Sequence, residues 1–415
     1  INIEGSNGTT NFAHGSGTVI ITHDGASDIK ADGVTLALNN LTINHASANI
    51  NLKSNLSVAG NLVISAGELD TDSSNFALTV TGATSVTGTL TCNNSTISLG
   101  SGLTSAYGLT VNTGGTFVGG GGTHTFGGLF VADHASADCT LTSGNTTING
   151  ENSDNYNFTV YDGSTLDNAD GTVIFTGPTS QIYLQSSATV QSGEPRLHNL
   201  TLNSSSNTLT LGHHLTVEGD LEINAGTLDT ESSNNRALTV TGEMHSQGTF
   251  NGNSSTVTVR NLLIEGGTFN SPDGSGMLNI TGEGSSGLGD GYAFRRVSGA
   301  FVDNTGTVTF KTPTTTSIRM GTPNQDFYNV IFDESSTGGV YSTNDEGFTV
   351  TNDCTLTDGD FDTTLGTATP LIDIQGDLTI GANNTFGGIT QTQTSDISFG
   401  SLTIASGGTY NATSG

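Results

Sequence analysis

The chain has 415 residues, of which 58 are glycine and 33% are hydrophobic, and it contains no tryptophan. This is too little apolar material for the thick core of a two-layer domain of this length, so we expect a thin core. Lysine and arginine number 9 against 38 aspartate and glutamate residues, which gives a formal net charge of −29. A charge of this sign disfavours binding to nucleic acids and to anionic lipid surfaces.

Two further classes of protein are disfavoured by the pattern of residues. The three cysteines, Cys92, Cys139 and Cys354, are far apart and lack the paired spacing of a zinc site or a disulfide framework. Cys354 falls where the repeat otherwise has Leu221, so it is expected to be a core residue. No segment approaches the roughly 18 uninterrupted apolar residues of a membrane helix, and we expect no membrane span.

The chain contains long internal repeats. Residues 38–71 match residues 197–230 without a gap at an offset of 197 − 38 = 159, and a looser copy with one insertion covers residues 328–363. A Gly-Thr-Val element precedes each copy, at Gly17, Gly171 and Gly306.

These elements predict one continuous solenoid of successive modules. Residues 1–16 end a preceding module, and modules then cover residues 17–170, 171–305 and 306–415, the last of them incomplete. Because both termini fall within repeat sequence, we expect the chain to be part of a longer polypeptide.

A shorter period lies inside each module. Gly-Thr corners at Gly226, Gly248 and Gly267 are 22 and 19 residues apart, the scale of one coil in a stacked-coil protein. Residues 215–217, 221–223 and 227–229 alternate apolar with polar positions, as half-buried strands do. The sequence therefore predicts an all-β, right-handed parallel β-helix (β-solenoid) of stacked three-strand coils. The expected inward-pointing residues of this coil are Leu215, Val217, Leu221, Ile223 and Leu228.

Internal repetition also separates structural residues from candidate functional ones. A residue that recurs in every module is expected to serve the coil, whereas a functional site should be unique to one module. Asp70, Asp229 and Asp362 occupy the same corner of successive copies. Asp72 and Glu231 would complete acid/base pairs with the first two, but such a repeated pair is a poor signature of an enzyme.

Two weak candidate metal sites are present in the sequence. Asp358, Asp360 and Asp362 alternate along one segment, and calcium accepts such oxygen ligands, although a solvated turn is the simpler interpretation. The histidines are scattered, and their closest grouping, His124 and His134 with Cys139, lacks the spacing of a metal site. We expect no catalytic site, no metal and no cofactor, with calcium as the weak exception.

One charged cluster is not repeated. Asp290, Tyr292, Arg295 and Arg296 lie in a segment whose other copy has Thr159 and Val160 at the arginine positions. Adjacent arginines could contact an acidic sugar, as in polysaccharide lyases, or could neutralise neighbouring carboxylates, which is the preferred interpretation.

The whole chain resembles the long β-strand-repeat proteins of tailed phages of marine bacteria. The likeness is carried by residues 198–202 (HNLTL), 215–221 (LTVEGDL), 225–230 (AGTLDT) and 238–242 (LTVTG). The resemblance implies a structural component of a virion fibre or appendage, which assembles with itself or with other subunits. The chain is also similar to bacterial β-solenoid surface adhesins.

The expected role is that of an extracellular shaft without catalytic activity, which could present a region that binds a receptor such as a host surface glycan. A bacterial or archaeal surface adhesin or filament is the first alternative, and a β-helical polysaccharide lyase or depolymerase is the second. The absence of tryptophan and the aromatic content of 6% argue against a sugar-binding tip in this segment.

Overall fold

The computed structural model describes most of the chain. The described residues are 1–3, 14–31, 35–104, 106–131, 136–150, 156–161, 163–185, 189–190, 196–282, 292–313, 316–321, 326–334, 339–343, 346–363, 371–388 and 396–411. They divide into two compact units, Ile1–Thr216 and Val217–Gly415. The boundary between the units falls inside the module expected at residues 171–305.

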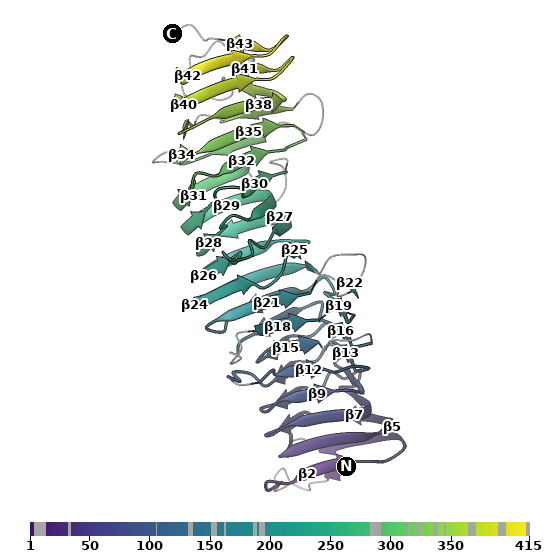
Figure 1. Ribbon diagram of the computed structural model, residues 1–415. Helices are drawn as coiled ribbons and strands as arrows, with labels where there is room; N and C mark the ends of the chain where they lie inside the picture. The colour runs from purple at the N-terminus through teal and green to yellow at the C-terminus, as the bar shows by residue number, and fades with distance from the viewer. Residues whose placement is uncertain are drawn as a thin grey trace. The chain divides into compact units, whose positions relative to one another are not determined.

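The described residues form strands and no helix, and strands make up 62% of the structure (Figure 1). No helix that could cross a membrane is present among them. The strands of the first unit are β1 (Asn2–Ile3), β2 (Thr18–Ile21), β3 (Gly25–Ala31), β4 (Leu36–Leu38), β5 (Asn40–Leu52), β6 (Leu56–Val58), β7 (Leu62–Asp70), β8 (Leu78–Val80), β9 (Thr84–Val86), β10 (Thr89–Thr91), β11 (Ile97–Leu99), β12 (Leu109–Val111), β13 (Thr116–Val118), β14 (His124–Phe126), β15 (Leu129–Val131), β16 (Asp138–Thr140), β17 (Asn145–Ile148), β18 (Tyr156–Val160), β19 (Thr165–Asp167), β20 (Thr172–Phe175), β21 (Ser180–Leu184), β22 (Thr189–Val190), β23 (Arg196–Leu197) and β24 (Asn199–Leu211).

The strand β25 (Leu215–Val217) contains the boundary between the units. The remaining strands belong to the second unit and are β26 (Leu221–Asp229), β27 (Leu238–Ser246), β28 (Thr249–Asn251), β29 (Thr256–Asn270), β30 (Met277–Ile280), β31 (Tyr292–Val302), β32 (Thr307–Phe310), β33 (Thr316–Arg319), β34 (Asp326–Phe327), β35 (Asn329–Asp333), β36 (Val340–Ser342), β37 (Phe348–Val350), β38 (Cys354–Asp358), β39 (Asp360–Asp362), β40 (Leu371–Ile380), β41 (Thr385–Gly387), β42 (Asp396–Ile404) and β43 (Thr409–Asn411).

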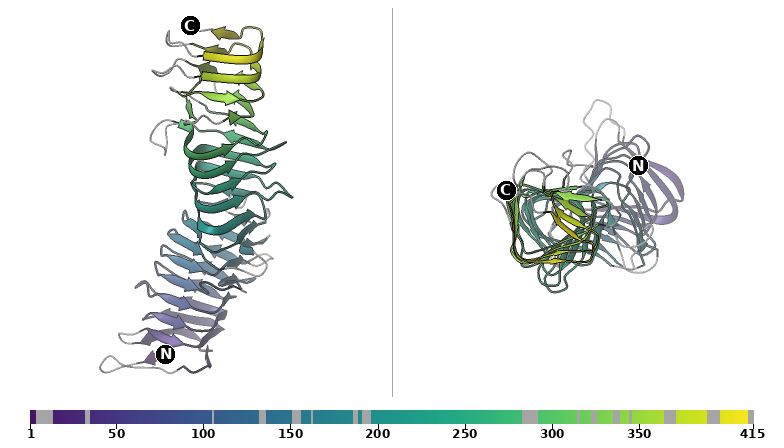
Figure 2. Two further views of the ribbon diagram at one scale, coloured as in Figure 1. Left: turned by 90° about the vertical axis from the view of Figure 1, so that its left-hand side faces the viewer. Right: turned by 90° about the horizontal axis from the view of Figure 1, so that it is seen from above.

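Within each unit, the strands pair in parallel with strands of the next coil along the chain. In the first unit β7, β10, β13 and β16 form one face, β8, β11, β14 and β17 form a second, and β9, β12, β15 and β18 form the third. Figure 2 shows these stacked coils from the side and from above. The structure confirms the expected parallel β-solenoid of three-strand coils, with about 15 turns.

The core is a column of inward-facing side chains that stack from coil to coil. On the first face of the first unit, Leu69, Leu90, Phe117, Cys139 and Leu166 lie directly above one another and are fully buried. Their neighbours along each strand point outward, as the two-residue period of a strand requires, and all of these neighbours except Val118 are polar. The five residues predicted to point inward near residue 220 are likewise at most 2% exposed, namely Leu215, Val217, Leu221, Ile223 and Leu228.

Glycine at the corners allows the coils to approach closely. A Cβ atom on Gly88 would lie 2.3 Å from the carbonyl oxygen of Gly67 in the preceding coil. The equivalent corner in the second unit repeats this contact, because a Cβ on Gly248 would lie 2.7 Å from the oxygen of Gly226. Gly67 and Gly226 also have φ angles of 79° and 87°, which favour glycine. The Gly-Thr period therefore reflects backbone packing at stacked corners.

Candidate functional site

The repeated carboxylates form a structural corner. In the first unit Asp70 Oδ1 accepts hydrogen bonds from the backbone N–H of Asp72 at 2.7 Å and from Asn93 Nδ2 in the next coil at 2.6 Å. Behind it, the buried Thr71 hydroxyl receives a 2.8 Å bond from Ser95 Oγ. One carboxylate thus fixes its own turn and links two successive coils.

The second unit contains the same corner. Asp229 Oδ1 accepts bonds from the backbone N–H of Glu231 at 2.7 Å and from Asn253 Nδ2 at 2.9 Å, while Ser255 Oγ donates to Thr230 Oγ1 at 2.9 Å. Asp72 and Glu231 both adopt the left-handed backbone conformation, with φ angles of 64° and 67°. The aspartates at these corners therefore hold turns.

The three aspartates that were considered for calcium have different environments. Asp358 is exposed and accepts a bond from the N–H of Gly359, whereas Asp360 Oδ1 accepts a 2.6 Å bond from the N–H of Thr385. Asp362 is fully buried. Within the described ranges no group of three or more His, Cys, Asp or Glu residues is placed to hold a metal ion.

The histidine and cysteine candidates lie on different faces of the coils. His124 belongs to the column of Ile97 and Thr146, whereas Cys139 belongs to the column of Phe117 on another face. His134 lies outside the described residues. All three cysteines are buried and unpaired with one another, and burial raises the pKa of Cys354 to about 12. The expectation that Cys354 is a core residue is confirmed.

The adjacent arginines of the non-repeated cluster have different environments. Arg296 is 4% exposed, and it donates from Nε to the carbonyl oxygen of Met320 at 2.7 Å and from Nη1 to that of Gly299 at 2.9 Å. Arg295 is half-buried and pairs with Arg319 of the next coil. The structure therefore does not join Arg295 and Arg296 in one clamp for an acidic sugar.

The arginine whose side chain lies beside that of Arg295 is Arg319 of the next coil, and not Arg296 as expected from the sequence. The guanidinium carbons of Arg295 and Arg319 lie 5.9 Å and 5.4 Å from the centre of the Tyr292 ring, within range of cation–π attraction. Arg319 also forms an ion pair with Glu346, whose other oxygen accepts a 2.7 Å bond from the N–H of Gly321. Asp290, the remaining member of the cluster, lies outside the described residues.

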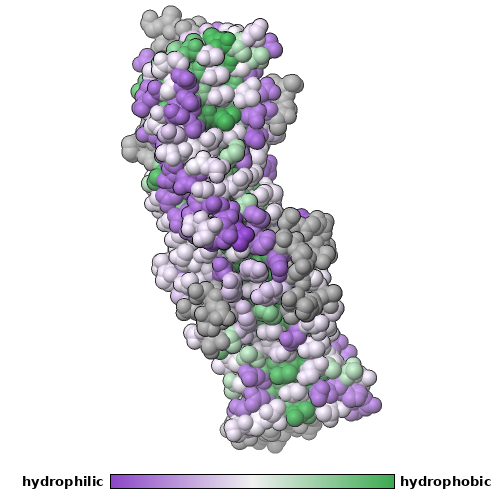
Figure 3. Space-filling view, viewed as in Figure 1, coloured by the Kyte–Doolittle hydropathy of each residue, from purple (hydrophilic) through white to green (hydrophobic). Residues whose placement is uncertain are grey.

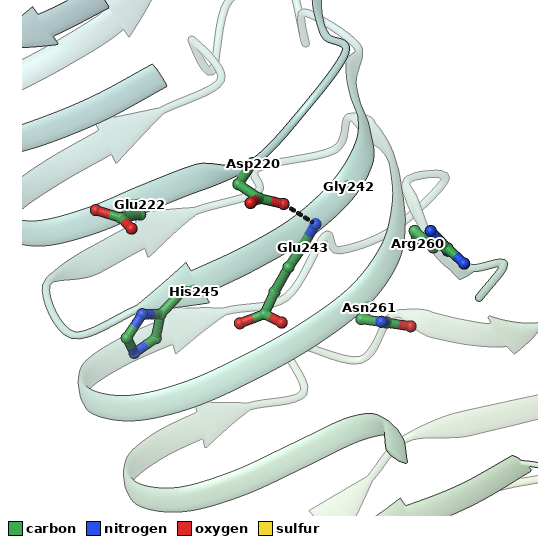
Figure 4. A pocket seen from close by; sticks show the side chains of 7 residues that line it. All are labelled: Asp220, Glu222, Gly242, Glu243, His245, Arg260 and Asn261. Carbon is green, nitrogen blue, oxygen red and sulfur yellow. Dashed lines mark hydrogen bonds between the residues drawn. The ribbon is translucent and has the colours of Figure 1, made fainter. Parts of the chain in front are cut away.

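A pocket of about 300 Å³ opens on the second unit, and Figure 4 shows its lining side chains. It is lined by Asp220, Glu222, Gly242, Glu243, His245, Arg260 and Asn261. The Glu243 carboxylate extends toward His245, and Asp220 Oδ1 accepts a 2.8 Å bond from the backbone N–H of Glu243 (Figure 4). Three carboxylates and one histidine thus share a small volume.

Most of the charge in this pocket is unique to one module. The bond from the Glu243 N–H to Asp220 has an equivalent in the first unit, where the Ala83 N–H donates to Asn61 Oδ1 at 2.9 Å. Asp220 therefore serves a corner. In the first unit Val63 and Ser85 pair in the register that Glu222 and His245 adopt in the second. Glu222 and His245 thus satisfy the criterion for a site, which is that they are unique to one module. Glu243 does not, because in the third module the backbone N–H of Asp377 donates the equivalent bond to Asp353 Oδ1 at 3.0 Å.

The charges of the pocket act on Glu243. Burial raises the pKa of the Glu243 carboxyl, and the nearby Asp220, Glu265 and Glu222 carboxylates raise it further, while His245 opposes them. Nε2 of His245 lies 3.1 Å from Oε2 of Glu265. A carboxyl with a raised pKa in a pocket can act as an acid or bind a cationic group.

The carboxylate pocket and the arginine pair lie along one outward column of the second unit. Through successive coils Glu222 pairs with His245, His245 with Leu263, Leu263 with Arg295, and Arg295 with Arg319. We call this column the charged column. Negative charge lies at its N-terminal end and positive charge at its C-terminal end. The sequence analysis identified Arg295 but not the other members of the column. Residues 222 and 319 are far apart along the chain and come into one column only through the pairing of successive coils.

Comparison of the chain with protein-family models, with curated proteins and with solved structures returned no match.

Proposed function

We propose that the chain is an elongated structural shaft of an extracellular fibre, in a phage virion appendage, and that it has no catalytic activity. The observation that carries this proposal is the duplicated corner at Asp70 and Asp229. Both copies use their carboxylates to join successive coils. The corner aspartates, which could be read in the sequence as catalytic acids of a hydrolase, therefore stabilise the stacking of successive coils.

The surface chemistry supports an extracellular role. The net charge of −29 favours solubility and mutual repulsion of side surfaces, which suits a protein that is displayed in solution. Figure 3 shows a visible surface that is mostly hydrophilic or neutral, with small separate hydrophobic patches. A bacterial or archaeal surface adhesin has the same physical requirements and is the alternative assignment.

We further propose that the chain associates with itself or with other subunits, and that the apolar side chains of β42 form one contact surface. In β40 the core residues Ile372 and Ile374 are fully buried, whereas their β42 counterparts Ile397 and Phe399 are half-buried. Ile404 of β42 is 42% exposed, although its pair in β40 is fully buried. Strand edges with apolar side chains favour pairing with another strand.

A depolymerase assay tests the absence of catalysis. The intact chain is incubated with acidic and with neutral bacterial polysaccharides, and the products are sized by chromatography. We expect no change in polymer length. If the polymers shorten, and if Glu243→Gln or Arg295→Ala abolishes the shortening while Asp220→Asn does not, the chain is an enzyme. Asp220→Asn is a matched control because Asn61 makes the equivalent bond in the first unit.

Sedimentation at increasing protein concentration tests the stacking partner. We expect self-association that Ile404→Lys weakens and Val297→Lys leaves unchanged. Val297 is a suitable control because it is 46% exposed and lies in β31, away from the last coil. A wild-type chain that stays monomeric at all concentrations would remove the support for assembly through β42.

A further inference from the structure

Five aromatic side chains form a continuous strip on one face of the first unit. Ring centres are separated by 5.1 Å from Tyr107 to Phe130, 5.4 Å from Phe130 to Tyr161, and 5.7 Å from Tyr161 to Tyr183. Tyr156 adds a ring 5.7 Å from Tyr183. We call these residues the aromatic strip, which contains four of the eight tyrosines of the chain.

The strip lies on the outside of the solenoid. Phe130, Thr159 and Tyr183 stack at one position of β15, β18 and β21, between inward-facing residues that are fully or almost fully buried. Figure 1 shows these strands one above the other in the first unit. Tyr156 is 38% exposed, and the other four rings are half-buried. The strip is therefore a partly solvated surface, distinct from the phenylalanines of the core.

Glycine residues leave space for two of the rings. A Cβ atom on Gly212 would lie 2.9 Å from Cδ2 of Tyr183, and one on Gly128 would lie 3.3 Å from Cδ1 of Tyr107. Thr159 is 1% exposed although it faces outward, and its hydroxyl has no hydrogen-bond partner among the described residues. A buried hydroxyl without a partner is costly, so this surface is not simply optimised for stability.

The second unit repeats the tyrosine and its bulge beside a different neighbour, and there the tyrosine is buried. Tyr156 begins β18 and pairs with β21 through a bulge before Phe158, and Tyr292 begins β31 and pairs with β33 through the same bulge. Tyr183 and Arg319 occupy equivalent positions next to these tyrosines. The tyrosine and its bulge recur, while the neighbouring residue changes from aromatic to cationic.

We propose that the aromatic strip binds a neutral polysaccharide chain that lies along the axis of the first unit. Apolar faces of sugar rings stack on aromatic side chains, and the tyrosine hydroxyls can exchange hydrogen bonds with sugar hydroxyls. The ring spacing follows the coils, which suits a linear polymer with a regular repeat. No member of the strip is a carboxylate, a lysine or an arginine, so a neutral polymer fits better than an acidic one.

This binding activity extends the proposed extracellular role, but it does not depend on assembly into a fibre. Nucleic acid would also stack on aromatic rings, but the strip lacks the cations that bind phosphates and the chain carries a charge of −29. A second copy of the chain is the other occupant that an apolar strip could accept. The experiments below separate these occupants.

Affinity electrophoresis is the first test, because the acidic protein migrates in native gels. The probes are hydroxyethyl cellulose and dextran as neutral polymers and alginate as an acidic one. We expect a neutral polymer to retard the wild-type chain, and we expect Tyr161→Ala with Tyr183→Ala to weaken the affinity by roughly tenfold or more. Tyr183→Phe should retain binding because it keeps the ring. The matched control is Tyr292→Ala in the second unit, which should leave the retardation unchanged.

Tyrosine fluorescence of the wild-type chain is the second test and requires no variant to fold. Since the chain has no tryptophan, the emission comes from eight tyrosines, four of which lie in the strip. Titration with the retarding neutral polymer should change the emission. Retardation by alginate alone, equal retardation of all variants, or unchanged emission would overturn the proposal. Loss of an oligomer in the double variant would also overturn it, since the strip would then bind a second copy.

Discussion

His124 is expected to make the first unit sensitive to acid. Its side chain is fully buried against the rings of Phe117 and Phe126, whose centres lie 5.8 Å and 5.7 Å away. Neither ring nitrogen has a hydrogen-bond partner among the described residues. Burial lowers the pKa of His124 to about 4 from 6.5, because a charged imidazole would lose its hydration without gaining a partner.

The magnitude follows from the linkage of proton binding to folding. In the unfolded chain His124 takes up a proton as the pH falls below 6.5, whereas in the folded chain it stays neutral until about pH 4. The unfolded state therefore binds more protons in this window, and folding stability falls as the pH falls through it. A shift of this size corresponds to about 3 kcal/mol lost between pH 7 and pH 4.

The test is a comparison of the wild type with His124→Phe in urea unfolding at pH 7 and at pH 4. Because the larger ring can disturb the core at both pH values, the informative quantity is the change in unfolding free energy between them. The variant should lose about 3 kcal/mol less than the wild type. The matched control is His23→Phe, since His23 is exposed. Equal pH dependence of wild type and His124→Phe would refute the reasoning.

Three further predictions concern carboxylates. Asp229→Ala should lower the unfolding free energy by about 1 to 3 kcal/mol in urea titrations, because Asn253 loses its acceptor across two coils. The ion pair with Lys53 lowers the pKa of Asp72 to about 2, so Asp72→Asn should reduce thermal stability at pH 7, an effect that disappears as the pH falls from 4 to 2. Glu243→Gln should raise the melting temperature at pH 7 and change it little below pH 4, because the raised pKa of Glu243 destabilises only the ionised folded form.

The sequence predicted the features that each coil must satisfy by itself. Leu228 points inward and Asp229 holds the corner, because a strand alternates its side chains and a tight turn needs an acceptor for its backbone N–H groups. Both requirements are local, so they leave a pattern in the sequence. Repetition at an offset of 159 residues made this pattern visible twice.

The sequence could not predict which outward residues become neighbours. Leu69, Leu90, Phe117 and Cys139 stack in one column, yet their spacings are 21, 27 and 22 residues. Since the loops between strands vary in length, the register from one coil to the next cannot be counted along the chain. The aromatic strip and the charged column both depend on this register. Low aromatic content also hid the strip, because composition does not show that half of the tyrosines gather on one face.

A tyrosine recurs in both units with different neighbours. Tyr156 and Tyr292 recur with the same bulge, and recurrence alone would assign a purely structural role to both. Each holds a different neighbour, however, which is the ring of Tyr183 in one unit and the guanidinium of Arg319 in the other. A repeated fold can thus fix one contact and vary the residue beside it at little cost, since outward positions do not disturb the core. Tyr183 and Arg319 are therefore the residues expected to set the charge of the ligand at each position, because they differ beside a tyrosine that stays the same.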